Sequence, residues 1–223
     1  MFEMKNRPAP DEIRNRIVRV AGEVFGMHGY RGTTIRQITQ RAGVNVAAVN
    51  YYFRDKSELY IRVLREAKCW SQDVAVFKLS GNPEDQLRDF ILAFVRHLLD
   101  PNRPAWHVQV ITQEMLHPTP ALDMLTKELT EPLFQRVRGL VEVIAAVKLS
   151  DMQLDLLASS IMGQCLFYIR SRSMLERIAP ELSSSPDRID RIAEHIASFS
   201  LVALRGLFSK STQPARVRAT SQS

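Results

Sequence analysis

The sequence predicts an all-α fold, with a three-helix N-terminal domain followed by a larger helical domain. Apolar residues recur at three- and four-residue steps along most of the chain, which is the period of an amphipathic helix. Alternation typical of strands does not continue for more than a few residues, and only 9 of the 223 residues are glycine. A hydrophobic content of 45% with 24% charged residues is that of a globular chain and excludes a disordered one.

The first predicted helix lies in "DEIRNRIVRVAGEVFGMHGY" at 11–30, and Gly29 supplies its stop. A second helix starts at "TIRQ", which has the spacing of a capping box: Thr34 can accept from the third backbone N–H, and Gln37 can reach back. This helix ends near Ala42, and Gly43 makes the turn that follows.

A helix of six residues, 46–51, comes next, with Asn45 as its cap. So short a helix is unstable alone, because nucleation outweighs its few hydrogen bonds. The helix at 35–42 is its natural support, and two short helices joined by a tight turn make a helix-turn-helix. The capping pattern "DKSE" at 55–58 then starts a long helix that runs toward Phe77.

Beyond Ser80 the composition changes, and "SGNPED" marks a break. Pro132 is expected to kink one of the helices that follow, and the tail at 211–223 is expected to be disordered. The later helices are predicted at 84–99, 104–116, 120–147, 151–178 and 187–208.

The two sides of the 46–51 helix differ. Val44 and Val49 are predicted to face the core, whereas Ala47 and Ala48 lie on the outer side. An outer side without bulk lets a helix backbone approach the base edges of a nucleic acid.

The positive charge is concentrated near the N-terminus. Residues 1–70 hold 13 Lys and Arg against 7 Asp and Glu, whereas residues 71–223 hold 17 of each. This distribution suggests that the first third meets a polyanion. A solvated basic face without a partner explains the charge equally well.

The stretch "GTTIRQITQRAGVNVAAVNYYFRDKSEL" resembles the DNA-binding helix-turn-helix of the tetracycline-repressor (TetR) family of bacterial transcription regulators. The matching features are Thr33 and Thr34, Ile38, Ala42-Gly43-Val44, Tyr51-Tyr52-Phe53, Lys56 and Leu59. One departure is Asn50, where the family commonly has a Tyr that contacts phosphate. The resemblance covers most of a domain of about 50 residues and is specific in its pattern.

The resemblance implies contacts to double-stranded DNA. A helix N-terminus, tyrosine hydroxyls and Lys56 suit phosphates, while the asparagine amides suit adenine. No Arg or Lys lies within 46–51, so contacts to guanine must come from Arg36, which can reach a groove edge, or be lacking. We expect an operator with important A·T positions. The expected DNA-binding residues are Thr34, Arg36, Asn45, Val46, Ala47, Ala48, Asn50, Tyr51, Tyr52 and Lys56.

The resemblance also implies that the remaining helices sense a ligand and form a homodimer. "TQEMLHPTPALDML" and "SSIMGQCLFYIRSR" resemble the subgroup with a CerR-like C-terminal domain. The expected division is a DNA-binding domain at 1–58, an effector-binding and dimerisation domain at 59–210 and a tail at 211–223.

Two of the late helices combine small and bulky residues, as close helix packing across a two-fold axis requires. Ordinary core packing within one subunit is the alternative. The expected interface residues are Ser159, Gly163, Leu166, Phe167, Ile196, Phe199, Val202 and Ala203.

The interior of the helical domain is the expected place for a ligand. Polar residues on apolar stretches are candidates, although each suits a core or surface position as well. They are His97, Trp106, Gln109, Glu114, Gln164 and Tyr168. Release of DNA by an unidentified small-molecule effector is an implication of the family.

Two alternatives compete with a regulator. Glu114 and His117 have the Glu-x-x-His spacing of di-iron bundles, and His107 could join them at a single metal, but a second such motif is missing from the sequence. The other alternative is an adaptor that binds any polyanion. We expect no catalytic residue, no metal and no cofactor.

The compartment follows from what the sequence lacks. No run is long enough to span a membrane, and the N-terminus has no apolar signal region. Cys69 and Cys165 have no ligand or CxxC spacing. We therefore expect a cytoplasmic protein.

Overall fold

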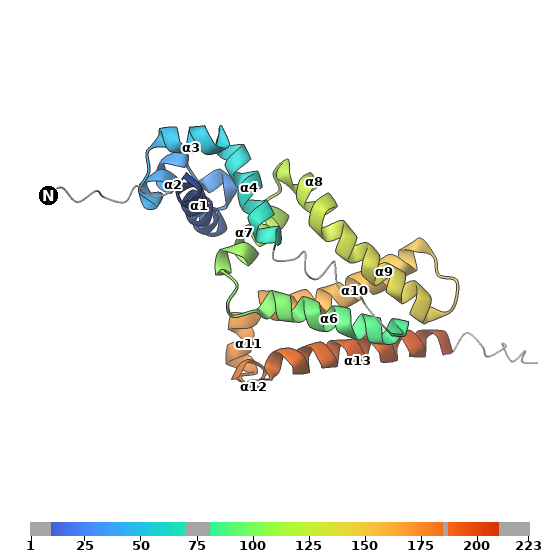
Figure 1. Ribbon diagram of the computed structural model, residues 1–223. Helices are drawn as coiled ribbons and strands as arrows, with labels where there is room; N and C mark the ends of the chain where they lie inside the picture. Colours follow the sequence, from blue (N-terminus) through green and yellow to red (C-terminus); the bar gives the residue numbers. More distant parts are fainter. Residues whose placement is uncertain (1–9, 70–80, 185–186, 210–223) are drawn as a thin grey trace, which may run out of the picture. The chain divides into compact units, whose positions relative to one another are not determined.

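The computed structural model describes residues 10–69, 81–184 and 187–209. Throughout these ranges the regular elements are helices and no strand occurs, which confirms the predicted all-α class (Figure 1). The chain forms two compact units: residues 1–76 with 100–132, and residues 77–99 with 133–223.

Unit 1 begins with a bundle of four helices. They are α1 (Pro10–Gly32), α2 (Ile35–Ala42), α3 (Val46–Phe53) and α4 (Lys56–Cys69). Gly29 lies within the span of α1 but has a left-handed φ of 67°, so the regular helix is interrupted where the sequence predicts its end. The part of the predicted helix from residue 70 to Phe77 lies outside the described residues.

Three later elements complete unit 1: α7 (Ala105–Leu116), α8 (Ala121–Leu125) and the π-helix η1 (Thr126–Thr130). α7 packs closely on α1 because α1 has glycine at the crossing. A Cβ atom placed on Gly22 would lie 2.3 Å from the ring of Trp106. Trp106 and Val110 therefore share one core with Phe25, Ile38 and other residues of the first four helices.

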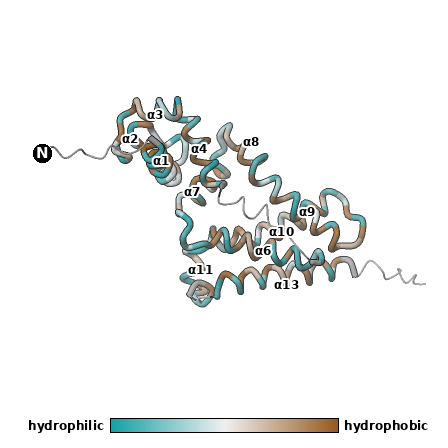
Figure 2. Tube along the Cα trace, viewed as in Figure 1, coloured by the Kyte–Doolittle hydropathy of each residue, from teal (hydrophilic) through white to brown (hydrophobic). Residues whose placement is uncertain are grey.

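Unit 2 contains α6 (Pro83–Leu99), α9 (Glu131–Ala145), α10 (Asp151–Arg170), α11 (Arg172–Ile178), α12 (Glu181–Ser184) and α13 (Arg188–Ser209). α6 and α13 pack side by side in antiparallel directions (Figure 1). In Figure 2, hydrophobic and hydrophilic residues alternate along α13, as burial of one side of a helix requires.

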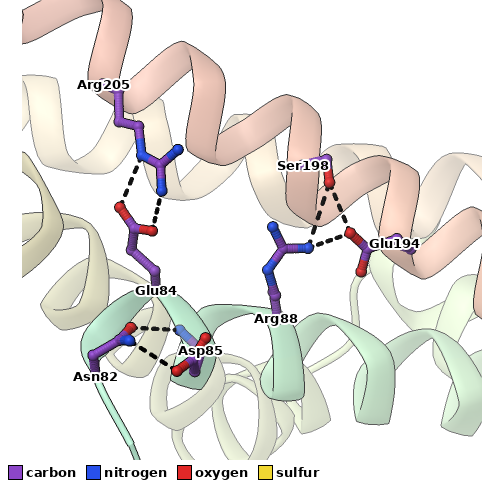
Figure 3. A network of polar contacts seen from close by, with 7 residues as sticks. All are labelled: Asn82, Glu84, Asp85, Arg88, Glu194, Ser198 and Arg205. Atoms are coloured by element: carbon purple, nitrogen blue, oxygen red, sulfur yellow. Dashed lines mark hydrogen bonds and ion pairs between the residues drawn. The ribbon is translucent and has the colours of Figure 1, made fainter.

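Ion pairs follow the α6–α13 contact on its exposed side. Figure 3 shows Glu84 paired with Arg205, and Arg88 with Glu194 and Ser198. The guanidinium of Arg205 lowers the pKa of the Glu84 carboxyl. Further along, the side chain of Arg96 donates two hydrogen bonds to Asp190, at 2.8 and 2.9 Å. Exposed pairs of this kind fix the register of two helices more than they add stability.

Two predicted helices are each divided in the structure. The segment predicted at 120–147 consists of α8, η1 and α9. The π-helix ends at Thr130, two residues before Pro132, whose missing N–H cannot continue the α-helical bonding pattern. The segment predicted at 151–178 is divided at Ser171, which has a φ of −99° and a ψ of 10°.

The two compact units differ from the expected division at residue 58. That boundary falls within α4, and α7, α8 and η1 group with the first four helices. The functional division of the chain stays a prediction. The predicted tail at 211–223 lies outside the described residues.

Candidate nucleic-acid interface

The α2 helix has the cap that its sequence predicts. The Gln37 backbone N–H donates to the Thr34 hydroxyl at 3.2 Å, and the Thr34 N–H donates to the Gln37 side chain at 2.7 Å. At the other end Gly43 adopts φ 64° and ψ 38°, and the Val44 N–H donates to the Thr39 carbonyl at 3.0 Å. The turn into α3 is therefore fixed at both sides.

The α3 helix is two residues longer than predicted and is capped by Asn45. The Asn45 side-chain oxygen accepts from the Ala48 N–H at 2.8 Å, so this amide has a structural task. Val49 and Phe53 are buried and attach the helix to the core of unit 1. Burial at positions four apart keeps one side of so short a helix in place.

The opposite side of α3 is open to solvent. Val46, Ala47 and Asn50 are exposed, and Tyr51 is 81% exposed. Ala48 was expected on this outer side as well, but it is half-buried because it packs against the core of unit 1. A surface made of a methyl group, an amide and a phenol lets the helix backbone come close to the edges of base pairs, where the amide can hydrogen-bond.

The start of α4 is fixed by a cap at Asp55 and by a contact between Lys56 and the ring of Tyr30. Asp55 caps this helix by accepting from the N–H groups of Ser57 and Glu58, at 2.8 and 2.9 Å. The Lys56 ammonium lies 4.3 Å from the centre of the Tyr30 ring, and partial burial lowers the pKa of Lys56. The cation is thus held at a defined place beside the end of α3.

The remaining predicted DNA contacts also lie on the surface of unit 1. Thr34 and Arg36 are exposed on the first turn of α2. Tyr52 is half-buried, and its ring lies 5.0 Å from that of Tyr51. The buried Thr33 has another task, since its hydroxyl donates to the Gly29 carbonyl at 2.8 Å.

Comparison with known families identifies both parts of the chain. Residues 17–63 match the model of bacterial regulatory proteins of the tetR family, and residues 83–204 match the C-terminal domain of the HTH-type transcriptional dual regulator CecR. The chain belongs to the TetR family, in its CecR-like subgroup. It is a transcription regulator, not an enzyme. The resemblance found in the sequence is confirmed, with CecR as the name of the subgroup.

Curated relatives agree with this assignment. CecR of Shigella flexneri is 24% identical over 174 residues, 71% of this chain and 76% of CecR. NicS of Pseudomonas putida, a transcriptional repressor, is 33% identical over 93 residues, which are 39% of this chain and 44% of NicS. RutR of Escherichia coli K12 is 31% identical over 88 residues, 39% of this chain and 42% of RutR.

Solved structures show the same fold. A TetR-like regulator from Rhodococcus sp. RHA1 has a TM-score of 0.64 at 16% identity, over 90% of this chain and 100% of the other. The hemolysin II transcriptional regulator HlyIIR has a TM-score of 0.60 at 20% identity, over 84% and 98%.

The residues expected to bind a ligand in this TetR-family chain are divided between the two units. In unit 1, Trp106 is buried against α1 and Gln109 is exposed beside Gly26. Glu114 is fully buried, and its carboxylate accepts from the Tyr60 hydroxyl at 2.9 Å and the Thr119 N–H at 2.8 Å. Within unit 1, Glu114 thus joins α4 to the α7–α8 turn.

The other three expected ligand residues lie in unit 2. His97 is half-buried near the end of α6, and the Gln164 amide donates to the Ser160 carbonyl at 3.3 Å. Tyr168 lines a cavity of about 40 Å³ together with Leu99 and Ile192. The cavity is much smaller than the roughly 300–1,000 Å³ of typical ligand pockets, so an organic ligand there would need the helices to move.

The residues expected at a dimer interface lie on α10 and α13. Ser159, Gly163 and Phe167 are exposed, as are Phe199 (59%) and Val202 (67%), while Leu166 and Ala203 are half-buried. Ile196 is 1% exposed and belongs to the core of unit 2. Met152 and Leu156, which are not in the expected set, are also exposed and continue the same helical spacing toward the start of α10.

No group of His, Cys, Asp and Glu suited to a metal ion occurs in the described parts of the chain. Glu114 uses its oxygens for hydrogen bonds, and His117 is exposed. Among the same residues, no helix combines the length and the apolar character that crossing a membrane demands.

Proposed function

We propose that this chain is a repressor that binds a pseudo-palindromic operator as a homodimer and leaves it when a small-molecule effector binds. The observation that carries the proposal is the open side of α3, where Ala47 and Asn50 are exposed while Val49 on the opposite side is buried. This is the arrangement that a recognition helix needs in a major groove.

The contacts divide into two classes. Asn50 is suited to adenine, and Val46, Ala47 and Ala48 to thymine methyl groups, which favours A·T positions in the operator. Phosphates would be met by Thr34, Tyr51, Tyr52 and Lys56, whereas Arg36 would reach a base edge in the groove. Asn45 contributes mainly by capping α3.

Dimerisation is proposed through the exposed residues of α10 and α13: Met152, Leu156, Ser159, Gly163 and Phe167 on α10, and Phe199 and Val202 on α13. We call this set the α10–α13 face. Its large apolar side chains would be removed from water in a dimer. Two copies related by a two-fold axis would then present two α3 helices to two half-sites.

The effector is proposed to act by binding two states of the dimer with different affinity, since a ligand shifts an equilibrium only through such a difference. Tyr168 is the contact that we place first, because it lines a cavity. The name of NicS as a repressor supports repression, and the lack of a spanning helix among the described residues suits the cytoplasm.

The experiment is a selection of duplexes from a random-sequence pool with the purified full-length chain. We expect enrichment of a site with two half-sites related by two-fold symmetry, and a preference over unrelated competitor DNA that persists at physiological salt. A pool without enrichment would contradict the proposal.

That negative result would favour the adaptor, the second candidate. Its supporting observation is the excess of 13 basic over 7 acidic residues within residues 1–70. Such an adaptor binds all polyanions alike, and its affinity falls steeply with salt.

A further inference from the structure

A hollow lined by four arginines lies in unit 1, at the end of α3. Arg14 of α1, Arg54 after α3, and Arg62 and Arg65 of α4 line it, with Tyr52 and Ile61 (this set is called the arginine hollow). Its volume is about 280 Å³. A water molecule occupies about 30 Å³ in the liquid, so the hollow has room for a group much larger than one solvent molecule.

The charge in the arginine hollow is only partly balanced. Glu58 is its lining carboxylate. Arg62 pairs with Glu66 at 2.9 Å, and the Arg65 guanidinium lies 3.4 Å from Glu128.

Glu128 has a second and closer cation, since the Lys68 ammonium lies 2.7 Å from it. Among the described residues, neither Arg14 nor Arg54 has an ion pair. An anion that enters the hollow would therefore meet an excess of positive charge.

One hydrogen-bond donor in the arginine hollow lacks an acceptor. The Nε–H of Arg62 is buried and has no hydrogen-bond partner among the described residues. Buried donors are nearly always paired, because an unpaired one has lost its water without replacement. The Arg62 guanidinium pairs with Glu66 through one Nη, so it keeps a donor that no group among the described residues uses.

The backbone at Arg54 is strained. Arg54 has φ 61° and ψ −57°, and the Asp55 N–H donates across it to the Phe53 carbonyl at 2.6 Å, which makes a γ-turn of the rare form. A residue with a side chain seldom adopts this conformation, and such strain concentrates at binding sites. The turn directly follows α3, so the hollow adjoins the recognition helix.

The chemistry of the lining points to a phosphodiester. Guanidinium groups bind phosphate oxygens with two parallel hydrogen bonds, and Tyr52 and Ile61 offer an apolar wall to a sugar. We propose that the arginine hollow binds the backbone phosphate of the operator flank, next to the base pairs that α3 meets. This inference rests on the proposed function.

The DNA backbone is a better source of that phosphate than a free phosphorylated molecule. Tyr52 and Arg54 belong to the recognition helix and its cap, so a duplex held by α3 brings phosphates to this end of the helix. The arginines of the hollow also add to the positive charge of the first third of the chain, which increases its attraction to a duplex.

The test uses the full-length chain and the variant Arg14→Gln/Arg65→Gln. Neither residue lies on α2 or α3, and Glu128 keeps its bond to Lys68. The selected operator is prepared with flanks of about ten base pairs and with flanks trimmed to the last specified pair. Binding is measured by fluorescence anisotropy over a series of salt concentrations, and thermal unfolding verifies the fold.

We expect the variant to bind the flanked duplex about tenfold more weakly at physiological salt. The slope of log K against log salt should fall by about 1 to 2, since each phosphate contact contributes about 0.9. On the trimmed duplex the variant and the parent chain should agree. The control is Arg172→Gln/Arg177→Gln, which removes two exposed arginines from α11 and should leave the slope unchanged.

An unchanged slope on the flanked duplex, with the parent chain still selective for its operator, would overturn the inference and leave the proposed function standing. Calorimetry with adenosine monophosphate and with pyrophosphate tests the alternative that the arginine hollow binds a free phosphorylated molecule. Micromolar binding of either one, lost in the variant while DNA binding is kept, would assign the hollow to a small molecule and overturn its assignment to DNA. A parent chain with no preferred duplex would remove the proposed function itself.

Discussion

The exposed side of α3 and the α10–α13 face differ in the size and polarity of their side chains. α3 presents Ala47 and Asn50, so little stands between its backbone and a partner. The α10–α13 face presents Phe167, Phe199 and Val202, which are large and apolar. The first surface suits polar base edges, whereas the second is stabilised by contact with another apolar surface. Two exposed helical surfaces in one chain thus indicate two kinds of partner.

The two regions also differ in how they are supported. α3 has eight residues and depends on its cap and on Val49 and Phe53, which pack into the core of unit 1. α13 has 22 residues and is held by burial and by the ion pairs to α6. A change in the core is therefore expected to disturb the α3 side more than the α10–α13 face.

The largest expected effect is on the α10–α13 face. Val202→Lys should give a monomer, because it places a charge among apolar groups, and operator affinity should fall at least about 100-fold when the two half-sites are no longer bound together. Light scattering and anisotropy measure the two results. Val143→Lys is the matched control, since Val143 is also an exposed valine of unit 2 (61%) but lies on α9. A dimeric Val202→Lys protein would contradict the proposed interface.

The second largest effect is expected from a bulky side chain on the exposed side of α3. Ala47→Phe should weaken operator binding about 100-fold, or about 2.7 kcal/mol, because the ring occupies the space that the base edges need. Thermal unfolding should change little, since Ala47 is exposed. Ala47→Ser keeps the small size and should bind nearly as the parent chain does. Equal affinity of the Phe and Ser variants would show that α3 does not enter the groove.

The core that supports α3 is tested through the crossing of α1 and α7, which belongs to the same core. Gly22→Ala places a methyl group 2.3 Å from the Trp106 ring, so we expect a loss of about 1–3 kcal/mol in the free energy of unfolding, measured with urea. In Gly139→Ala the methyl group meets nothing within 4 Å, and we expect a gain of about 0.5–1 kcal/mol in the helix. Similar values for both variants would mean that this crossing tolerates rearrangement.

The smallest expected effect is that of a single phosphate contact. Lys56→Gln should lower affinity for every duplex about tenfold and reduce the salt slope by about 1, while the preference for the operator persists. Lys127→Gln removes an exposed lysine of η1 and should leave the slope as it is. A variant at Lys56 that loses sequence preference would give this residue a role in base recognition.

The sequence predicted the local features well, for identifiable reasons. The caps at Thr34, Asn45 and Asp55 depend on side chains and N–H groups three residues apart, so a short window contains all their atoms. The division at Ser171 was missed. The helical period continues through it, and no Gly or Pro marks the break.

The sequence predicted the two sides of α3 better than it predicted a common ligand site. The exposed and buried sides of α3 follow from its period and its caps, and the structure has Ala47 and Val49 on the expected sides. The polar residues expected around one ligand are divided between the two compact units. Polarity on an apolar stretch does not specify which helix the residue packs against, as Trp106 and Glu114 illustrate.

The sequence by itself determined the helices, their caps, the outward position of Ala47 and the family, because these depend on residues within a few positions of each other. Only the tertiary structure decided that α7 packs on α1 through Gly22, and that Arg14, Arg54, Arg62 and Arg65 line one hollow. These groups come from separate helices, and what brings them together is burial of a shared core, which depends on contacts between residues distant in the chain.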